Sequence, residues 1–109
     1  MKLEEGMFIR NHLGRIEKIQ TLEPYNDKQC INNHEFSNNV IKASHNIIDL
    51  IEVGDIVTTK HLGLEKEYIE VIDNETSLEI LKSYFKEKSL ELISVVTKQQ
   101  FESMKYEVK

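Results

Sequence analysis

Apolar residues in this chain occur only in short runs, which polar and charged residues interrupt every few positions. Even the apolar stretch over residues 47–51 is divided by Asp49. Such runs are far too short for a membrane-spanning helix, which needs about 20 apolar residues. They favour several short strands, and a chain of 109 residues has material for one hydrophobic core. We therefore expect a single domain over residues 1–109.

Turn-forming residues place the expected strands. Asn11 and Gly14 tolerate the positive φ of a tight turn, and they predict a hairpin with strands at 7–9 and 15–19. Pro24 lacks a backbone N–H, so we expect it to end the next strand. Residues 26–39 contain five asparagines, whose side chains bind nearby backbone groups, and they predict a loop with at most a short strand at 30–31. Further strands are expected at 40–44, 56–59, 65–73, 91–96 and 106–108, and residues 47–51 could be a helical turn or extended.

Two capping-box patterns predict helices near the end of the chain. Thr76 and Glu79 predict a longer helix over about 77–88, and Thr97 and Gln100 predict a short helix over about 98–104. We expect an α+β fold, with a twisted and mainly antiparallel sheet or a small Src-homology-3-like barrel. The residues predicted to be mostly buried are Phe8, Ile9, Ile16, Ile19, Val40, Ile41, Leu50, Ile56, Val57, Ile69, Val71, Leu81, Phe85, Ile93, Val95 and Phe101.

The only cysteine is the first candidate for chemistry. Cys30 and His34 form a C-x3-H pattern, and His12, His45 and His61 could add metal ligands. Cys30 could also form a Cys-His-Asp nucleophile with Asp49 and either His34 or His45. A structural zinc site normally uses paired ligands at two turns, and no second thiol is present. The glycines are isolated and form neither a phosphate-binding loop nor a nucleophile elbow. We expect no catalytic residue, no metal and no cofactor; a small enzyme or metal-binding protein using Cys30 and nearby histidines is the alternative.

Three carboxylates lie close together in the sequence at Asp49, Glu52 and Asp55. Their spacing does not match the alternating oxygen ligands of a calcium-binding loop. We therefore expect a turn, in which Gly54 adopts a positive φ and Asp55 binds backbone groups.

The negative charge is concentrated in residues 65–79. This segment has six carboxylates and one lysine, a net charge of −5, which equals the net charge of the whole chain. Clustered carboxylates can steer a basic partner, although they can also simply keep an edge strand soluble. We call the six residues the acidic strip and predict that they bind a partner protein: Glu65, Glu67, Glu70, Asp73, Glu75 and Glu79.

Three stretches carry a family resemblance: GMFIRNHLGRIEKI, IKASHNIIDLIEVGDIV and LELISVVTKQQFESMKYEV. They resemble small, mostly uncharacterised phage and prophage proteins of low-GC Gram-positive bacteria. The resemblance implies a small β-rich domain without a catalytic motif, and some proteins of this kind are similar to inhibitors of CRISPR nucleases. The acidic strip lies outside these stretches.

The resemblance and the charge together predict a non-catalytic, anti-CRISPR-type protein that inhibits a host defence protein by occlusion. A CRISPR-associated nuclease is the expected partner, because its positive nucleic-acid channel would attract the acidic strip. The contact could instead use the asparagine-rich segment 26–39. A nucleic-acid-binding small barrel of the phage apparatus is a further alternative, but low basic content argues against direct nucleic-acid binding. The single cysteine and the acidic start of the chain favour the host cytoplasm and no membrane contact.

Overall fold

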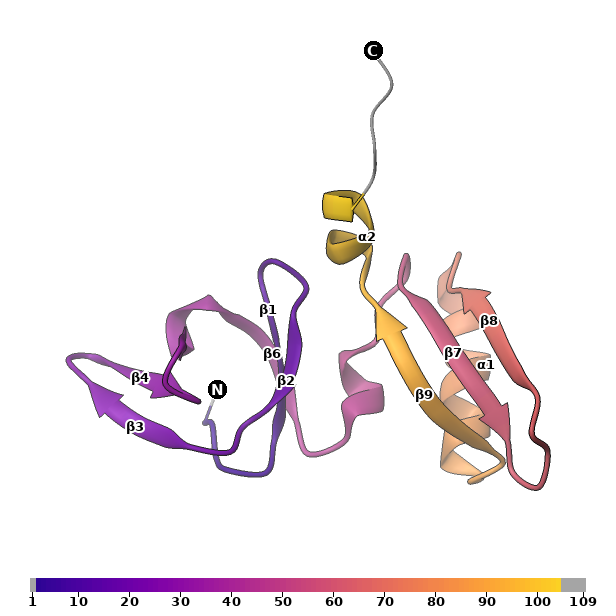
Figure 1. Ribbon diagram of the computed structural model, residues 1–109, viewed down its shortest axis with the longest axis horizontal. Helices are drawn as coiled ribbons and strands as arrows, with labels where there is room; N and C mark the ends of the chain where they lie inside the picture. The colour runs from indigo at the N-terminus through magenta and orange to yellow at the C-terminus, as the bar shows by residue number, and fades with distance from the viewer. Residues whose placement is uncertain (1, 105–109) are drawn as a thin grey trace, which may run out of the picture. The chain divides into compact units, whose positions relative to one another are not determined.

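The computed structural model describes residues 2–104, which contain nine strands, two α-helices and two 3₁₀ turns (Figure 1). The chain divides into two compact units, residues 1–50 and 51–109, which we call unit 1 and unit 2. The strands form three antiparallel sheets of three strands each, so the predicted α+β fold is confirmed. None of the three sheets in the described residues closes on itself, so the barrel alternative is wrong. The prediction of a single domain stays a prediction.

The first sheet of unit 1 has the strand order β2-β1-β6 and contains the predicted hairpin. It consists of β1 (Phe8–Asn11), β2 (Ile16–Lys18) and β6 (Val40–Ser44). Gly14 has a φ of 80°, and its N–H donates to the Asn11 carbonyl at 2.9 Å. The Asn11 side-chain oxygen also accepts from the Leu13 and Arg15 amides, at 3.0 and 2.9 Å. The hairpin forms because its turn residues satisfy the backbone locally.

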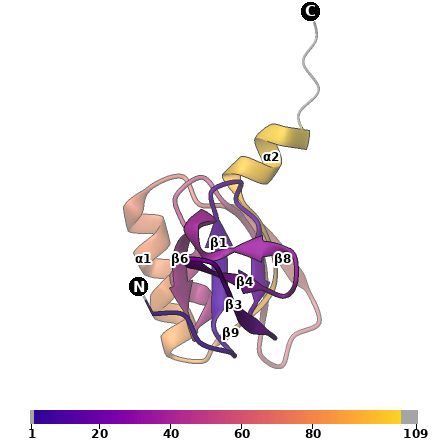
Figure 2. The same ribbon diagram turned by 90° about the vertical axis from the view of Figure 1, so that its left-hand side faces the viewer.

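The second sheet of unit 1 lies where the sequence predicted mostly loop. It consists of β3 (Leu22–Tyr25), β4 (Lys28–Ile31) and β5 (Glu35–Phe36), seen with the rest of unit 1 in Figure 2. Asn26, Asn32 and Asn33 have φ values of 54°, 52° and 64°, so they form tight turns between these strands. Pro24 lies inside β3 and does not end it. This is possible because β3 is an edge strand, where a missing N–H need not remove a ladder bond.

The hydrophobic core of unit 1 takes residues from both of its sheets, and unit 1 also contains two 3₁₀ turns, η1 (Ser37–Asn39) and η2 (Ile47–Leu50). The residues at 47–50 are therefore helical, which decides between the two predictions for that segment. Arg10 is fully buried, and its Nη1 donates to the Leu50 carbonyl at 2.9 Å. The buried apolar cluster consists of Leu3, Ile9, Ile19 and Ile31, with Met7, Leu22, Val40 and Ala43 packed against it.

Unit 2 is a three-stranded sheet with one long helix on one face. The strand order is β8-β7-β9, with β7 (Ile56–His61), β8 (Glu67–Val71) and β9 (Leu90–Val96). The helix α1 (Glu75–Lys86) lies behind this sheet in Figure 1 and buries Leu78 and Leu81. The short helix α2 (Lys98–Met104) follows β9. The strand predicted at 106–108 lies outside the described residues.

The two helices test the two capping predictions. The α2 box is confirmed, because the Gln100 N–H donates to Thr97 Oγ1 at 3.3 Å and the Thr97 N–H donates to Gln100 Oε1 at 3.0 Å. The predicted box at Thr76 is wrong. The cap of α1 is Asn74, whose side-chain oxygen accepts from the Ser77 N–H at 2.8 Å. The helix therefore begins two residues earlier than predicted.

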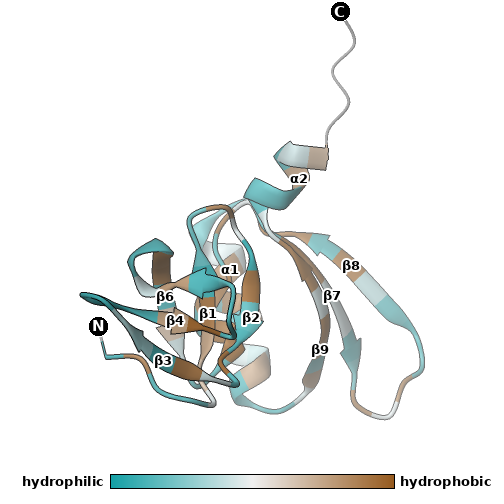
Figure 3. Ribbon diagram, turned by 60° about the vertical axis from the view of Figure 1, so that its left-hand side comes forward, coloured by the Kyte–Doolittle hydropathy of each residue, from teal (hydrophilic) through white to brown (hydrophobic). Residues whose placement is uncertain are grey.

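The core prediction is correct only in part. Five of the predicted residues are buried: Ile9, Ile19, Leu50, Val57 and Leu81. Five others are exposed: Ile41, Ile69, Val71, Ile93 and Phe101. In unit 2 the reason is that α1 covers only one face of the sheet, the face that carries Tyr68 and Glu70, so Ile69 and Val71 on the other face of β8 stay accessible. Figure 3 shows brown, apolar segments in the ribbons of β8 and β9. The list of predicted core residues also lacks five apolar residues that are buried: Leu3, Ile31, Ile51, Ile72 and Leu78.

Candidate functional site

The acidic strip lies entirely in unit 2, and all six of its side chains are exposed. Glu65 lies in the irregular segment before β8, and Glu67 and Glu70 belong to β8. Asp73 lies between β8 and α1, and Glu75 and Glu79 belong to the first half of α1. The carboxylates therefore follow one continuous path along an edge strand and into a helix.

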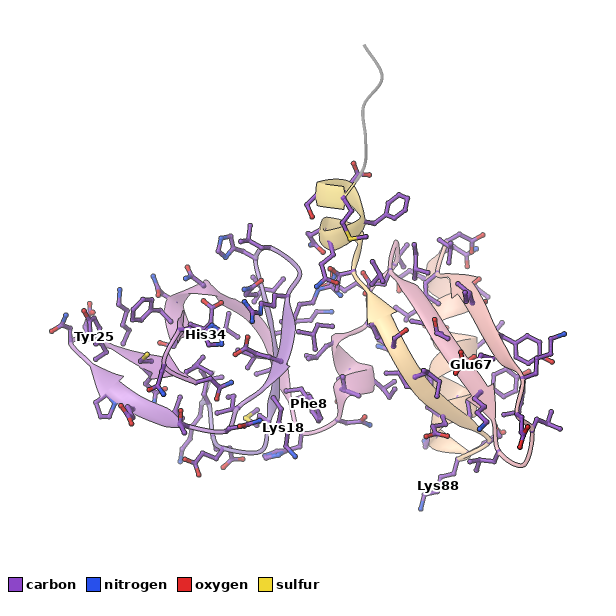
Figure 4. The ribbon with its side chains drawn as sticks, in the orientation of Figure 1. Phe8, Lys18, Tyr25, His34, Glu67 and Lys88 are labelled. Carbon is purple, nitrogen blue, oxygen red and sulfur yellow. The ribbon has the colours of Figure 1, made fainter. Side chains whose placement is uncertain are left out.

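The strip does not form one flat surface, because side chains alternate along a strand. Glu67 shares a face of β8 with Ile69 and Val71, and it stands in front of the sheet in Figure 4, with α1 behind. Glu70 lies on the opposite face, which is the face that α1 covers. In the ladder, Glu67 pairs with Lys60 and Glu70 with Val57. The two glutamates therefore meet different surroundings although they are three residues apart.

Asp73 has a structural role in the start of α1. Its Oδ1 accepts from Ser77 Oγ at 3.1 Å and from Asn74 Nδ2 at 3.0 Å. Glu75 lies in the first turn of the helix, where the helix dipole favours a negative charge. Part of the strip is thus explained by the stability of α1, and Glu65, Glu67, Glu70 and Glu79 are the carboxylates that local structure does not explain.

A cavity of about 330 Å³ lies between α1 and the sheet of unit 2. Side chains from β7, β8, α1 and β9 line it: Thr59, His61, Tyr68, Glu70, Ser77, Ile80, Leu81, Tyr84 and Leu90. Of these, sequence reasoning singled out Glu70 as a partner-binding residue, His61 as a possible ligand and Leu81 as core. The cavity itself was missed because its residues come from four elements. The available signal was the alternation in β8, which places Tyr68 and Glu70 on one face.

The cavity combines aromatic rings with a carboxylate. The Tyr68 ring meets the His61 ring edge-on, with centroids 5.7 Å apart. The Lys66 ammonium lies 5.3 Å from the Tyr68 centroid, which is within the range of a cation–π interaction. Among residues 2–104, no hydrogen bond or ion pair engages the Glu70 carboxylate. The site therefore offers an unpaired negative charge beside a ring that already attracts a cation.

The asparagine-rich segment of unit 1 is held by its own side chains. Asn32 Oδ1 accepts from the Gln20 and Thr21 amides, at 2.7 and 3.0 Å. Its Nδ2 donates to Glu17 Oε1 at 2.9 Å and to the Lys18 carbonyl at 2.8 Å. A second cavity, also about 330 Å³, lies beside this segment and is lined by Leu3, Asp27, Lys28, Gln29, Ser37, Asn38 and Val40. Its lining has one acidic and one basic residue, so it shows no preference for a charged ligand.

A buried carboxylate anchors the same unit. Glu35 Oε2 accepts from Asn11 Nδ2 at 2.7 Å, and Oε1 accepts from Asn39 Nδ2 at 3.1 Å and the Phe36 N–H at 3.0 Å. Burial raises the pKa of Glu35, but these hydrogen bonds outweigh burial and place the pKa below its ordinary value. Glu35 is therefore a charged structural group.

Cys30 and the histidines do not converge in the described residues. Cys30 is a half-buried free thiol in β4. His34 Nε2 lies 3.0 Å from Glu17 Oε1, and His45 Nε2 lies 2.6 Å from Glu4 Oε1. Over residues 2–104, no group of three His, Cys, Asp or Glu side chains is placed to hold a metal ion. The expectation of a non-catalytic protein stays a prediction.

Comparison of the chain with known protein families, curated proteins and solved structures finds no match. In the part of the chain that the structure describes, no helix has the length and apolar character to span a membrane. The geometry of the chain's own residues therefore carries the functional argument.

Proposed function

We propose that this protein is a non-catalytic binding module whose unit 2 docks onto a basic surface of another protein. The observation that carries the proposal is β8, an edge strand in which every residue is exposed and which presents carboxylates on both faces. An exposed edge can accept another chain, and a cluster of negative charge selects partners that carry positive charge.

Apolar exposure on the same strand supports a contact surface. Ile69 is 76% exposed and Val71 is 55% exposed, and both lie on the face of β8 that carries Glu67. Carboxylates alone would keep an edge strand soluble. Accessible apolar residues between them add area whose burial would stabilise a complex.

The resemblance to phage proteins extends the proposal to the partner. A host defence nuclease that binds guide RNA and target DNA has a positively charged channel. Carboxylates of the acidic strip would compete for the same arginines and lysines, and the protein would inhibit by occlusion in the host cytoplasm. The exposed carboxylates and the clustered charge of unit 2 support this mode of action.

Affinity capture from host lysate, read by mass spectrometry, tests the proposal. The test variant, which we call the strip variant, changes Glu65, Glu67 and Glu70 to Gln. It leaves Asp73 intact, because Asp73 supports the start of α1. The matched control changes three exposed glutamates elsewhere in the chain to Gln: Glu5, Glu23 and Glu102.

We expect the wild type and the control to retain the same basic protein and the strip variant to lose it. Equal capture by all three proteins, or capture of no host protein by the wild type, would contradict the proposal.

A further inference from the structure

We infer that the cavity between α1 and the sheet of unit 2 receives an arginine side chain of the partner protein. The inference rests on the proposed function and names the chemical group that unit 2 recognises. It comes from the lining residues of the cavity and from the unpaired state of Glu70 within the described residues.

The size of the cavity suits one side chain. Pockets for small molecules span about 300–1,000 Å³, and a volume of about 330 Å³ lies at the lower end of that range. The apolar walls come from Ile80, Leu81 and Leu90. They match the methylene groups of a long side chain, which pack along apolar surface while the charged head reaches a polar group.

The polar lining selects a cation. Glu70 supplies a carboxylate, and the surrounding segment carries a net charge of −5, so an anionic ligand would be repelled. Tyr68 and Tyr84 come from β8 and α1, and these two residues are 43% and 45% exposed. Two accessible rings and one carboxylate are the groups that bind a guanidinium, which stacks on aromatic faces and pairs with a carboxylate through two N–H groups.

A cation of the chain itself, Lys66, already lies against the Tyr68 ring. Its ammonium lies 5.3 Å from the centroid of the Tyr68 ring. A lysine offers only a point charge, whereas a planar guanidinium can stack on a ring and still donate two parallel hydrogen bonds to Glu70. This difference is the reason for assigning arginine, and a blocked lysine is included as a probe in the test.

Titration of the intact protein with N-acetyl-arginine amide, followed by amide chemical shifts, tests the inference. The matching probes are the blocked forms of citrulline, which has the same shape without the charge, and of lysine. We expect blocked arginine to shift amide signals of the cavity residues with millimolar affinity, because a single side chain makes few contacts. Blocked citrulline should bind at least about fivefold more weakly, because it lacks the charge that pairs with Glu70. No saturable shift with arginine, or equal shifts with citrulline or lysine, would overturn the inference.

Two substitutions in β8 distinguish binding in the cavity from long-range electrostatic attraction by the acidic strip. E70Q and E67Q make the same change in charge, but only Glu70 lines the cavity. We expect E70Q to weaken arginine binding about fivefold to tenfold and E67Q by less than about twofold, because an exposed charge outside the contact adds little. Equal weakening by both would show that only the long-range field acts. Y84L, which removes a ring but keeps an apolar side chain, should also weaken binding, and unchanged binding would count against the inference.

Failure of this inference differs from failure of the proposed function. If blocked arginine does not bind at the cavity but the strip variant still loses its captured partner, the inference is wrong and the proposed function stands. If blocked arginine binds with the expected dependence on Glu70 but capture does not depend on the strip, the proposed function is wrong.

Discussion

Single residues hold unit 1 together through paired polar groups. Glu35 collects three hydrogen bonds, from Asn11, Asn39 and the Phe36 amide, and Asn32 makes four. A buried polar group whose partner is removed retains its full desolvation cost, so such residues tolerate change poorly. Hydrogen bonds of short polar side chains therefore stabilise unit 1 in addition to its small apolar core.

The first prediction concerns Glu35→Gln. The lowered pKa means that the ionised carboxylate stabilises the fold above its ordinary pKa of 4.5, and that this contribution is lost as the pH falls through the lower folded value. Gln keeps one acceptor but places an N–H₂ group against donors, so we expect a loss of about 1–3 kcal/mol in the free energy of unfolding at pH 7. The difference from wild type should shrink as the pH falls below 4.5. Urea unfolding read from the amide signals of Ile9 and Ile31 measures it.

Glu23→Gln is the matched control for this prediction, because Glu23 is an exposed glutamate in β3, a strand of the same sheet. It should change the free energy of unfolding by less than about 0.5 kcal/mol. A loss that is the same for both substitutions, or that does not depend on pH, would contradict the role assigned to Glu35.

The second prediction concerns Gly54→Ala. The sequence-based prediction of a turn is confirmed here, since Gly54 has a φ of 100° and Asp55 Oδ2 accepts from the Glu52 N–H at 2.7 Å. A Cβ at Gly54 would lie 3.1 Å from Lys98 Cδ, in addition to the strain of positive φ. We expect a loss of about 2–3 kcal/mol, since left-handed strain alone costs about 1–2 kcal/mol. Thermal unfolding compares it with Gly63→Ala, where φ is 84° but the space is open. An equal loss at both glycines would show that the Lys98 contact is unimportant.

At the level of elements, the sequence-based predictions are correct where both partners of a hydrogen bond lie in one short segment. The hairpin around Gly14 and the Thr97 box of α2 are such cases. They are wrong where two local patterns compete, as at the start of α1, where Asn74 caps the helix instead of Thr76. They are also wrong where the position of a strand in its sheet matters. Pro24 fits inside β3 because β3 is an edge strand, and the sequence does not show which strands are edges.

The third prediction tests the cap of α1. Asn74→Ala removes the acceptor of the Ser77 N–H and should cost about 1 kcal/mol in the free energy of unfolding. Thr76→Ala lies inside the helix and should be neutral or slightly stabilising, because alanine has the higher helix propensity. Urea unfolding of both variants decides between the two possible caps. A larger loss for Thr76→Ala would restore the capping box that the sequence predicted.

On the scale of the whole molecule, net charge is the property that the sequence predicted most directly. The location of −5 charges within residues 65–79 follows from counting alone, and all six carboxylates of the acidic strip are exposed. The division of Glu67 and Glu70 between two faces could not be predicted in the same way. It depends on which face of the sheet α1 covers, and the cavity that contains Glu70 exists only after four elements have packed.

The last prediction is that salt weakens binding to the basic partner mainly through the association rate. Exposed charges steer the encounter of two proteins over roughly the Debye length, which shortens from about 14 Å at 0.05 M salt to about 6 Å at 0.3 M. We expect this change in salt to slow association of the wild type about tenfold and that of the strip variant, with Glu65, Glu67 and Glu70 changed to Gln, about threefold or less. Dissociation rates should change less, because exposed ion pairs contribute little once the complex has formed. Surface plasmon resonance with the captured partner measures both rates, and the Glu5, Glu23 and Glu102 control variant should follow the wild type. The same salt dependence for the strip variant and the wild type would remove the strip from the steering of the partner, whatever contacts the cavity makes.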